Sequence, residues 1–238
     1  MVEFGCARLS AESGTVLSSA EMALADRQPT TRRRAEILAG RVAARRAMRS
    51  LGVSPRPVLH RDGLPDFGTG LVGSLSHSGD IALAAVAGSD RLGGIGVDVE
   101  TEGFPPPGAT RLLSRDDELT AAPPAGTYAH RRWLVALFSG KESLYKAVSG
   151  RTGSGVHPLD VRCLPTPFGF AARWRRELSP ELPAGVGARV YVQWFPGGVC
   201  TFVALPRRAP ARCDPTDFDP RHALRAALAA ARGGSDDR

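Results

Sequence analysis

Three consecutive prolines interrupt the chain near its middle, in the segment GFPPPG at residues 103–108. A proline fixes φ and has no backbone N–H to donate, so this segment cannot continue a helix or a central strand. A length of 238 residues is enough for one or two domains. We therefore expect two similar-sized halves, residues 1–103 and 104–238, that meet at this segment.

The first half mixes helix and strand patterns. Apolar residues at helical spacing predict an amphipathic helix over residues 31–51, ended by a glycine. The next patterns predict three strands, LVGSLSHS, IALAAVAG and GIGVDVE, at residues 71–78, 81–88 and 94–100. Residues 1–26 give no clear pattern. An α+β fold class follows.

The second half has the same mixed character. We expect a short helix over residues 114–120 with Ser114 as its N-terminal cap, and a long helix over residues 128–148. Strand patterns follow from residue 161 to residue 205. A C-terminal helix is expected over residues 219–232, where it would cover the core of this half or bind a partner.

The composition limits the function classes. The chain carries 31 basic and 24 acidic residues, which favours acidic partners such as nucleic acids, nucleotide phosphates or an acidic protein. No apolar run is long enough to span a bilayer, and the N-terminus lacks the pattern of a secretory signal. Four scattered cysteines are typical of reduced thiols in a cytoplasmic protein. We therefore expect no membrane association.

Two carboxylates stand in GVDVE. On a strand, Asp98 and Glu100 point to the same face, where they repel each other unless a cation lies between them. A hard divalent cation such as Mg²⁺ suits this pair. The alternative is a solvated strand end just before a loop.

The decapeptide FSGKESLYKA contains both lysines of the chain, Lys141 and Lys146. All other cationic side chains except the histidines are arginines, so a compact ammonium group is expected to be required here. On a helix, Glu142 and Lys146 are neighbours on one face. They form either part of a functional site or an ordinary surface ion pair.

Two further features could receive phosphate groups. GSLSHS places Ser76 and His77 at the end of a strand, where small residues and backbone N–H groups can bind phosphate oxygens. Arginines such as Arg41 lie along one side of the helix at residues 31–51, and arginine forks match phosphate geometry. A structural histidine and a solvated helix face are the alternatives.

In this order, GSLSHS, GIGVDVE and FSGKESLYKA resemble the 4′-phosphopantetheinyl transferase superfamily, over roughly residues 30–150. The resemblance implies transfer of the phosphopantetheine arm of coenzyme A to a serine of an apo carrier protein, with release of adenosine 3′,5′-bisphosphate. Acyl and peptidyl carriers both remain open. It also implies a monomer of two α+β halves with pseudo-twofold symmetry and the active site in the cleft between them.

The resemblance implies a role for each candidate residue. Asp98, Glu100 and Glu142 would hold Mg²⁺, with Glu142 also accepting the serine proton, directly or through a metal-bound water, and Lys146 would contact the pyrophosphate. The remaining contacts to coenzyme A would come from Arg33, Arg41, His60 or Arg61, Ser76, His77 and Lys141. His60 or Arg61 stands where the family usually has a lysine.

Two other functions compete with this interpretation. A basic nucleic-acid-binding protein built around the arginine-rich helix would bind more weakly as salt rises and would not need Mg²⁺. It leaves the three carboxylates and the two lysines unexplained, so we expect no nucleic-acid partner. An inactive relative that merely binds coenzyme A or carriers is the second alternative.

Overall fold

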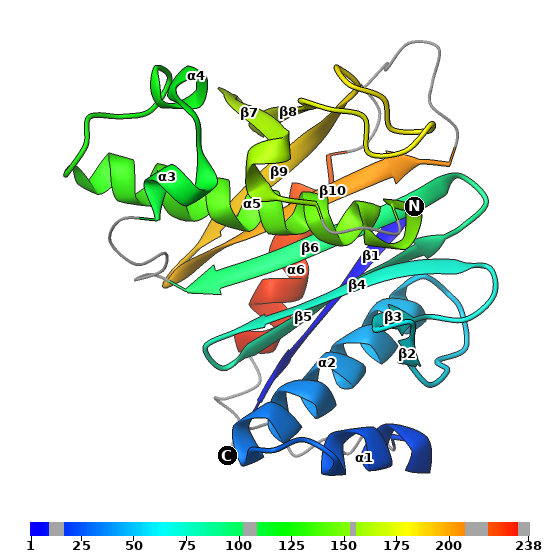
Figure 1. Cartoon of the computed structure of the whole chain (residues 1–238). Coiled ribbons are helices and arrows are strands. Elements are labelled where there is room, and N and C mark those ends of the chain that lie inside the picture. Colours follow the sequence, from blue (N-terminus) through cyan, green and yellow to red (C-terminus); the bar gives the residue numbers. More distant parts are fainter. Residues whose placement is uncertain (10–16, 102–108, 153–155, 208–218, 233–238) are drawn as a thin grey trace.

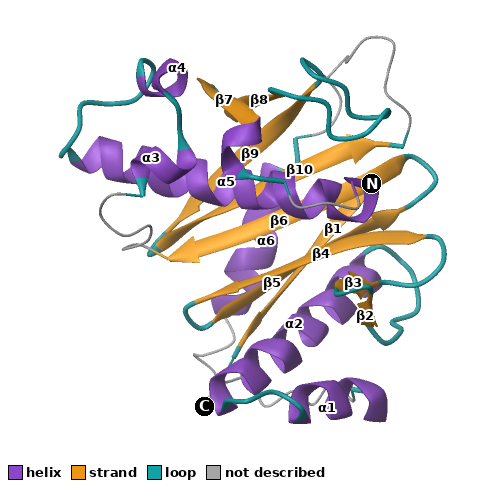
Figure 2. Ribbon diagram, in the orientation of Figure 1, coloured by secondary structure: helices purple, strands orange, loops and turns teal. Residues whose placement is uncertain are grey.

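The computed structural model has an α+β fold in which helices cover two antiparallel sheets (Figure 1, Figure 2). It describes residues 1–9, 17–101, 109–152, 156–207 and 219–232. The proline-rich segment at 103–108 therefore lies outside the described residues. None of the helices in these ranges is both long enough and apolar enough to cross a membrane.

The first sheet has the order β1-β5-β4, with β1 (Val2–Arg8), β5 (Ile81–Gly88) and β4 (Leu71–Ser78). The two strands predicted here are confirmed, whereas β1 carries no pattern that the sequence analysis identified. A small hairpin of β2 (Leu59–Arg61) and β3 (Leu64–Asp66) lies beside β4.

Helix α2 (Thr31–Ser50) covers one face of this sheet, with α1 (Ser19–Asp26) beside it. Thr30 caps α2, since its hydroxyl accepts a hydrogen bond from the Arg33 backbone N–H. The apolar side of α2, including Val42 and Met48, is buried against β1 and β5. The predicted helix is confirmed almost to the residue.

The second sheet has the order β6-β10-β9-β8-β7. Helix α5 lies across one face of it (Figure 1), preceded by the short helices α3 and α4, and the 3₁₀ turn η1 precedes β7. The bounds are β6 (Leu92–Thr101), α3 (Thr110–Leu113), α4 (Asp116–Leu119), α5 (Tyr128–Thr152), η1 (Pro158–Asp160), β7 (Val161–Thr166), β8 (Gly169–Trp174), β9 (Gly187–Phe195) and β10 (Gly198–Pro206).

The expected short helix over residues 114–120 is confirmed by α4 (Asp116–Leu119), but the capping role assigned to Ser114 is wrong. Ser114 is extended and ends α3, with its hydroxyl donating to the Thr110 carbonyl oxygen. Arg115 is the residue that precedes α4. A serine after one short helix and before another fits both cap positions by sequence, so the pattern alone did not distinguish them.

Helix α6 (Arg221–Arg232) lies behind the sheets and contacts both β1 and β9. Its apolar stripe, Leu224 and Leu228, is buried in a core with Phe4 of β1 and Phe202 of β10. The two phenylalanine rings meet edge to face, with centroids 5.1 Å apart. The C-terminal helix therefore closes a core that the two sheets share.

The sheets also share a strand order and a mode of helix packing. In each, the first strand pairs with the last, and the last pairs with the next-to-last. A Cβ atom added to Gly5 of β1 would lie 2.0 Å from the Ala43 carbonyl oxygen of α2. A Cβ added to Gly96 of β6 would lie 1.8 Å from the Ser143 carbonyl oxygen of α5. Glycine is required at both close approaches.

Beside each sheet, a buried glutamate pairs with a cationic side chain of the covering helix and accepts a backbone N–H. Glu21 of α1 pairs with Arg45 of α2 and accepts the Val58 N–H at 3.1 Å. Glu118 of α4 pairs with Lys141 of α5 and accepts the Cys163 N–H at 2.9 Å. The twofold relation between the halves stays a prediction, which these repeated features support.

Strands β4 and β6 lie side by side where the sheets meet, and in the described structure they belong to separate sheets. Three serines of β4 join them, because each hydroxyl accepts a backbone N–H of β6. We call these contacts the serine rungs: Ser74 with Val97 at 3.1 Å, Ser76 with Val99 at 3.3 Å, and Ser78 with Thr101 at 3.2 Å.

Candidate active site

A carboxylate cluster, defined as Asp98, Glu100 and Glu142, lies next to the serine rungs. Asp98 of β6 is only 3% exposed. Its Oδ1 accepts hydrogen bonds from Lys146 Nζ at 2.7 Å and Ser76 Oγ at 2.8 Å. Its Oδ2 is also buried, yet it has no hydrogen-bond partner among the described residues. A buried, bare carboxylate oxygen is costly unless a ligand completes it.

Glu100 follows Asp98 on the same side of β6, and its Oε2 accepts a hydrogen bond from Ser78 Oγ at 3.1 Å. Burial raises the pKa of Glu100 to about 7, and the negative charges of Asp98 and Glu142 add to this rise. The hydrogen bond from Ser78 and the charge of Lys146 oppose it. The three carboxylates therefore interact electrostatically.

Helix α5 contributes Glu142 and Lys146 to the same place. Burial raises the pKa of Glu142, Asp98 raises it further, and Lys146 lowers it. Lys146 Nζ also donates to the Val97 carbonyl oxygen at 3.2 Å. A buried polar contact fixes α5 here, because Ser143 Oγ donates to the carbonyl oxygen of Thr201 at 3.1 Å. Thr201 is the β10 partner of Asp98, so this contact holds Glu142 opposite Asp98.

The carboxylate cluster fits a hard divalent cation in its chemistry. Its donors are oxygens, one of them bare, and their mutual repulsion would be relieved by a positive ion. Within the described residues, however, no three side chains of the metal-binding types are arranged to hold a metal ion. Lys146 holds one oxygen of Asp98 in this arrangement.

A basic cluster, defined as Arg33, Arg41, His60 and His77, lies where α2 approaches β4 and the β2–β3 hairpin. Arg33 Nη1 donates to His77 Nε2 at 2.5 Å, and Arg41 Nη2 donates to His60 Nε2 at 3.2 Å. Burial lowers the pKa of both histidines, and the positive charge of Arg33 lowers it further. Lys146 also lowers the pKa of His77, so the basic and carboxylate clusters lie within electrostatic reach.

Three predicted phosphate contacts are engaged elsewhere. The hydroxyl of Ser76 faces Asp98, whereas its neighbour His77 points to the opposite side of β4, toward α2. Arg41 is 2% exposed, and its Nε donates to the Val58 carbonyl oxygen at 3.1 Å. Arg61 is exposed and pairs with Asp66 at 2.7 Å. Of the two alternatives in the hairpin, His60 belongs to the basic cluster through its contact with Arg41.

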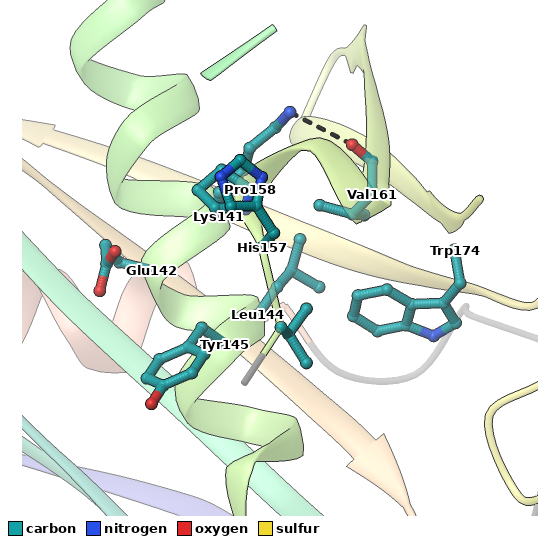
Figure 3. Close-up of a pocket in the computed structure, with 9 residues that line it drawn as sticks. Lys141, Glu142, Leu144, Tyr145, His157, Pro158, Val161 and Trp174 are labelled. Atoms are coloured by element: carbon teal, nitrogen blue, oxygen red, sulfur yellow. Dashed lines mark hydrogen bonds between the residues drawn. The ribbon is translucent and has the colours of Figure 1, made fainter. Parts of the chain in front are cut away.

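Lys141 does not join either cluster. Its ammonium group is buried, pairs with Glu118 at 2.8 Å, and donates to the carbonyl oxygens of Leu113 and Val161. Figure 3 shows the side chain running toward Val161 while Glu142 leaves the other side of α5. Consecutive helical residues diverge by roughly 100°, so a lysine directly before Glu142 faces away from it. Lys141 therefore lies apart from the carboxylate cluster but lines the cavity beside α5, and its predicted contact with coenzyme A stays a prediction.

Sequence reasoning missed two participants. Glu36 of α2 accepts from Arg33 at 3.1 Å and lies 3.6 Å from His77, so it holds both in place. Its signal was a helical spacing of three residues from Arg33. Ser78 is the last residue of GSLSHS and bonds Glu100. Its signal was the alternation of serines, which puts Ser76 and Ser78 on one face of β4.

A cavity of about 230 Å³ opens beside α5 (Figure 3). Glu142 lines it together with mainly apolar side chains. The others are Lys141, Leu144, Tyr145, Val156, His157, Pro158, Val161 and Trp174. An uncharged, extended chemical group would fit such a lining.

Acidic oxygens beside a lysine, with arginines and histidines nearby, are typical of an enzyme that acts on phosphate esters. Comparison with known proteins identifies the family. Residues 20–87 match the 4′-phosphopantetheinyl transferase N-terminal domain, and residues 94–180 match the 4′-phosphopantetheinyl transferase superfamily. The chain belongs to the 4′-phosphopantetheinyl transferase superfamily.

Individual relatives agree with this membership. The chain is 31% identical over 194 residues to enterobactin synthase component D of Salmonella typhimurium, a match that covers 75% of each protein. It is 38% identical over 117 residues to 4′-phosphopantetheinyl transferase Svp of Streptomyces mobaraensis, covering 48% of this chain and 47% of Svp. It is 37% identical over 117 residues to 4′-phosphopantetheinyl transferase PptT of Mycobacterium tuberculosis, covering 49% and 51%. The chain therefore matches about half the length of Svp and PptT.

Proposed function

We propose that the protein transfers 4′-phosphopantetheine from coenzyme A to a serine of an apo acyl or peptidyl carrier protein, with Mg²⁺ as its metal ion. Adenosine 3′,5′-bisphosphate is the second product. The observation that carries this proposal is the carboxylate cluster with Lys146, which lies inside a segment that matches the family and within electrostatic reach of the basic cluster.

Glu142 is the candidate general base. Burial raises the pKa of Glu142, which favours proton acceptance, and a bound cation would oppose this rise. The carrier serine oxygen attacks the phosphorus that bears the pantetheine arm, and the serine proton passes to Glu142. The bond from this phosphorus to the bridging oxygen breaks, and its electrons leave with adenosine 3′,5′-bisphosphate. Lys146 offsets the negative charge that develops on the departing phosphate.

Asp98, Glu100 and Glu142 would hold the Mg²⁺ ion. When bound, the ion withdraws negative charge from the pyrophosphate oxygens. The bare Oδ2 of Asp98 and the raised pKa values of both glutamates support this assignment.

The basic cluster would take the phosphate groups at the adenosine end of coenzyme A. Arg33 and His77 stand at the exposed side of this cluster, with Glu36 orienting them. Arg41 is buried and donates a hydrogen bond to His60, which would hold the imidazole in place. His60 would therefore take the place of the family's usual lysine, with Arg61, which pairs with Asp66, as the alternative.

The cavity beside Glu142 would receive the pantetheine arm. Leu144, Val161 and Trp174 offer apolar surface to an uncharged chain. Glu142, which also lines the cavity, would stand where the arm joins the phosphate. The net charge of +7 favours encounter with acidic carrier proteins. Each half of one chain supplies part of the site, so one copy of the chain is sufficient, and a cytoplasmic monomer with its active site in the cleft between the halves stays a prediction.

Intact-mass spectrometry of apo carrier proteins tests the proposal. Each carrier is incubated with coenzyme A, Mg²⁺ and either the wild-type protein, Glu142→Gln, or the matched control Glu177→Gln on the exposed surface. We expect a gain of one phosphopantetheine unit with the wild type and the control, and none with Glu142→Gln. Unmodified carriers of every class in the presence of folded wild-type protein would refute the transferase assignment.

A further inference from the structure

We infer that Ser76 and Ser78 are positioning residues for the carboxylate cluster, an inference that rests on the proposed function. Each hydroxyl occupies one oxygen of a carboxylate and leaves the second oxygen for the cation. The role predicted for Ser76, a contact to a phosphate of coenzyme A, is thereby replaced by a different one.

Ser76 has the hydrogen-bond geometry that this role requires. Its side chain is buried, its oxygen accepts the Val99 N–H at 3.3 Å, and its hydroxyl proton points to Asp98 Oδ1 at 2.8 Å. An ionised carboxylate can only accept, so the single proton of the Ser76 hydroxyl is donated to Asp98 while the serine oxygen accepts the backbone N–H. Oδ1 is thus held by Ser76 and Lys146, and the carboxylate plane leaves Oδ2 bare.

Ser78 repeats the arrangement one rung further along β4. Its oxygen accepts the Thr101 N–H at 3.2 Å, and its hydroxyl lies 3.1 Å from Glu100 Oε2. Strand periodicity places Asp98 and Glu100 opposite successive serines. Two carboxylates that repel each other are therefore kept side by side by two hydroxyl groups, before any cation binds.

Ser74 supplies a control within the same strand. It forms the same rung, with its oxygen accepting the Val97 N–H at 3.1 Å, and it is 4% exposed against 7% for Ser76. The residue of β6 that precedes Asp98 by two is Gly96, which has no side chain to receive a hydroxyl. Removing the Ser74 hydroxyl costs a rung without touching a carboxylate.

The experiment compares Ser74→Ala, Ser76→Ala and Ser78→Ala in the full chain. Binding of Mn²⁺ in the presence of coenzyme A is measured by calorimetry, the Mg²⁺ concentration for half-maximal transfer by carrier mass, and stability by urea unfolding. Loss of a residue that orients a metal ligand typically weakens metal binding by about 10–100-fold. We expect at least a tenfold rise in the Mn²⁺ dissociation constant for Ser76→Ala and a smaller rise for Ser78→Ala. We expect kcat to recover at saturating Mg²⁺.

Ser74→Ala should lower the unfolding midpoint about as much as Ser76→Ala while keeping the wild-type metal affinity. Equal metal affinities for these two variants, with an active wild type, would overturn the positioning role and leave the transferase proposal intact. If Ser76→Ala does not fold, the more exposed Ser78→Ala carries the comparison, and wild-type affinity there overturns the role. A wild type that neither binds Mn²⁺ nor modifies any carrier overturns both proposals.

Discussion

The closest helix-to-strand approach in the catalytic region predicts the effect of a single methyl group. A Cβ at residue 96 would lie 1.8 Å from the Ser143 carbonyl oxygen, about 1.6 Å short of the 3.4 Å at which ordinary contact begins. The obstacle is backbone, so Gly96→Ala must push α5 away from β6. Ser143 is next to Glu142, and Gly96 is two residues before Asp98. The substitution therefore separates the two carboxylates directly.

Two magnitudes follow from this displacement. Overpacking of a well-packed core costs about 1–3 kcal/mol of unfolding free energy, and a clash between backbones belongs at the upper end. A misplacement of about 1 Å in an active site can cost about 100-fold in rate. We expect Gly96→Ala to lose about 3 kcal/mol by urea unfolding and about 100-fold in kcat for carrier modification, measured by intact mass below the unfolding transition.

Gly5→Ala is the matched control for this prediction. Its Cβ would lie 2.0 Å from the Ala43 carbonyl oxygen, so the stability loss should be similar. That clash separates α2 from β1, away from the carboxylate cluster, although α2 carries Arg33 and Arg41 of the basic cluster. The KM for coenzyme A should therefore rise, whereas kcat at saturating coenzyme A should stay within about threefold of the wild type. If Gly96→Ala loses stability as Gly5→Ala does but keeps its rate, the spacing of β6 and α5 does not set the catalytic geometry.

Further predictions concern charge. Lys141→Met leaves the buried Glu118 with Arg175 as its one ion-pair partner among the described residues and should cost about 3 kcal/mol by urea unfolding. Lys146→Met also removes a cation from a buried carboxylate, that of Asp98, but the Lys146 side chain is 25% exposed and water can replace it, so this variant should cost less stability and lose transfer in the mass assay. An equal stability loss for the two would contradict the division of roles. The pKa of Glu100 is about 7 when folded against an ordinary 4.5, so the folded state binds more protons between these values and stability falls as pH rises through that range. Urea unfolding of the metal-free protein at about pH 5 and about pH 8 should show this fall, and a Glu100→Gln variant with an unchanged fall would disprove its origin. Association with an acidic carrier should slow as salt increases, because salt screens the net charge of +7. A stopped-flow association rate that does not change with salt would exclude electrostatic steering of the carrier.

Local patterns predicted most of the regular elements. The helix at α2 and the strands β4, β5 and β6 each carry a strong apolar period bounded by glycine or a capping residue. β1 escaped because its segment, VEFGCAR, is short and lacks a clear alternation, and its place depends on pairing with β5. Such a pairing is set by residues about 80 positions away, which a local pattern does not report.

For the candidate site, the sequence predicts which side chains lie together on one strand or one helix, but not how these elements meet. Asp98 and Glu100 follow from the strand period, and Glu142 with Lys146 follow from the helix period. The direction of the Lys141 side chain was not predicted, because it depends on Glu118 in another helix rather than on the sequence neighbour Glu142. No sequence pattern indicates which arginines of α2 are buried, because the burial of Arg45 depends on its ion pair with Glu21 of α1.

Hydrogen exchange at the serine rungs can report on the contact between β4 and β6 beside the carboxylate cluster. The amide protons of Val97, Val99 and Thr101 have side-chain oxygens as acceptors, so they lose protection whenever β4 parts from β6, even if every backbone ladder stays closed. Their exchange rates would therefore report how often Asp98 and Glu100 lose their alignment. Mg²⁺ and coenzyme A can be added to see whether they slow exchange at these three amides more than in the rest of β6. If they do, the opening equilibrium between β4 and β6 measures the fraction of molecules in which the carboxylates are aligned.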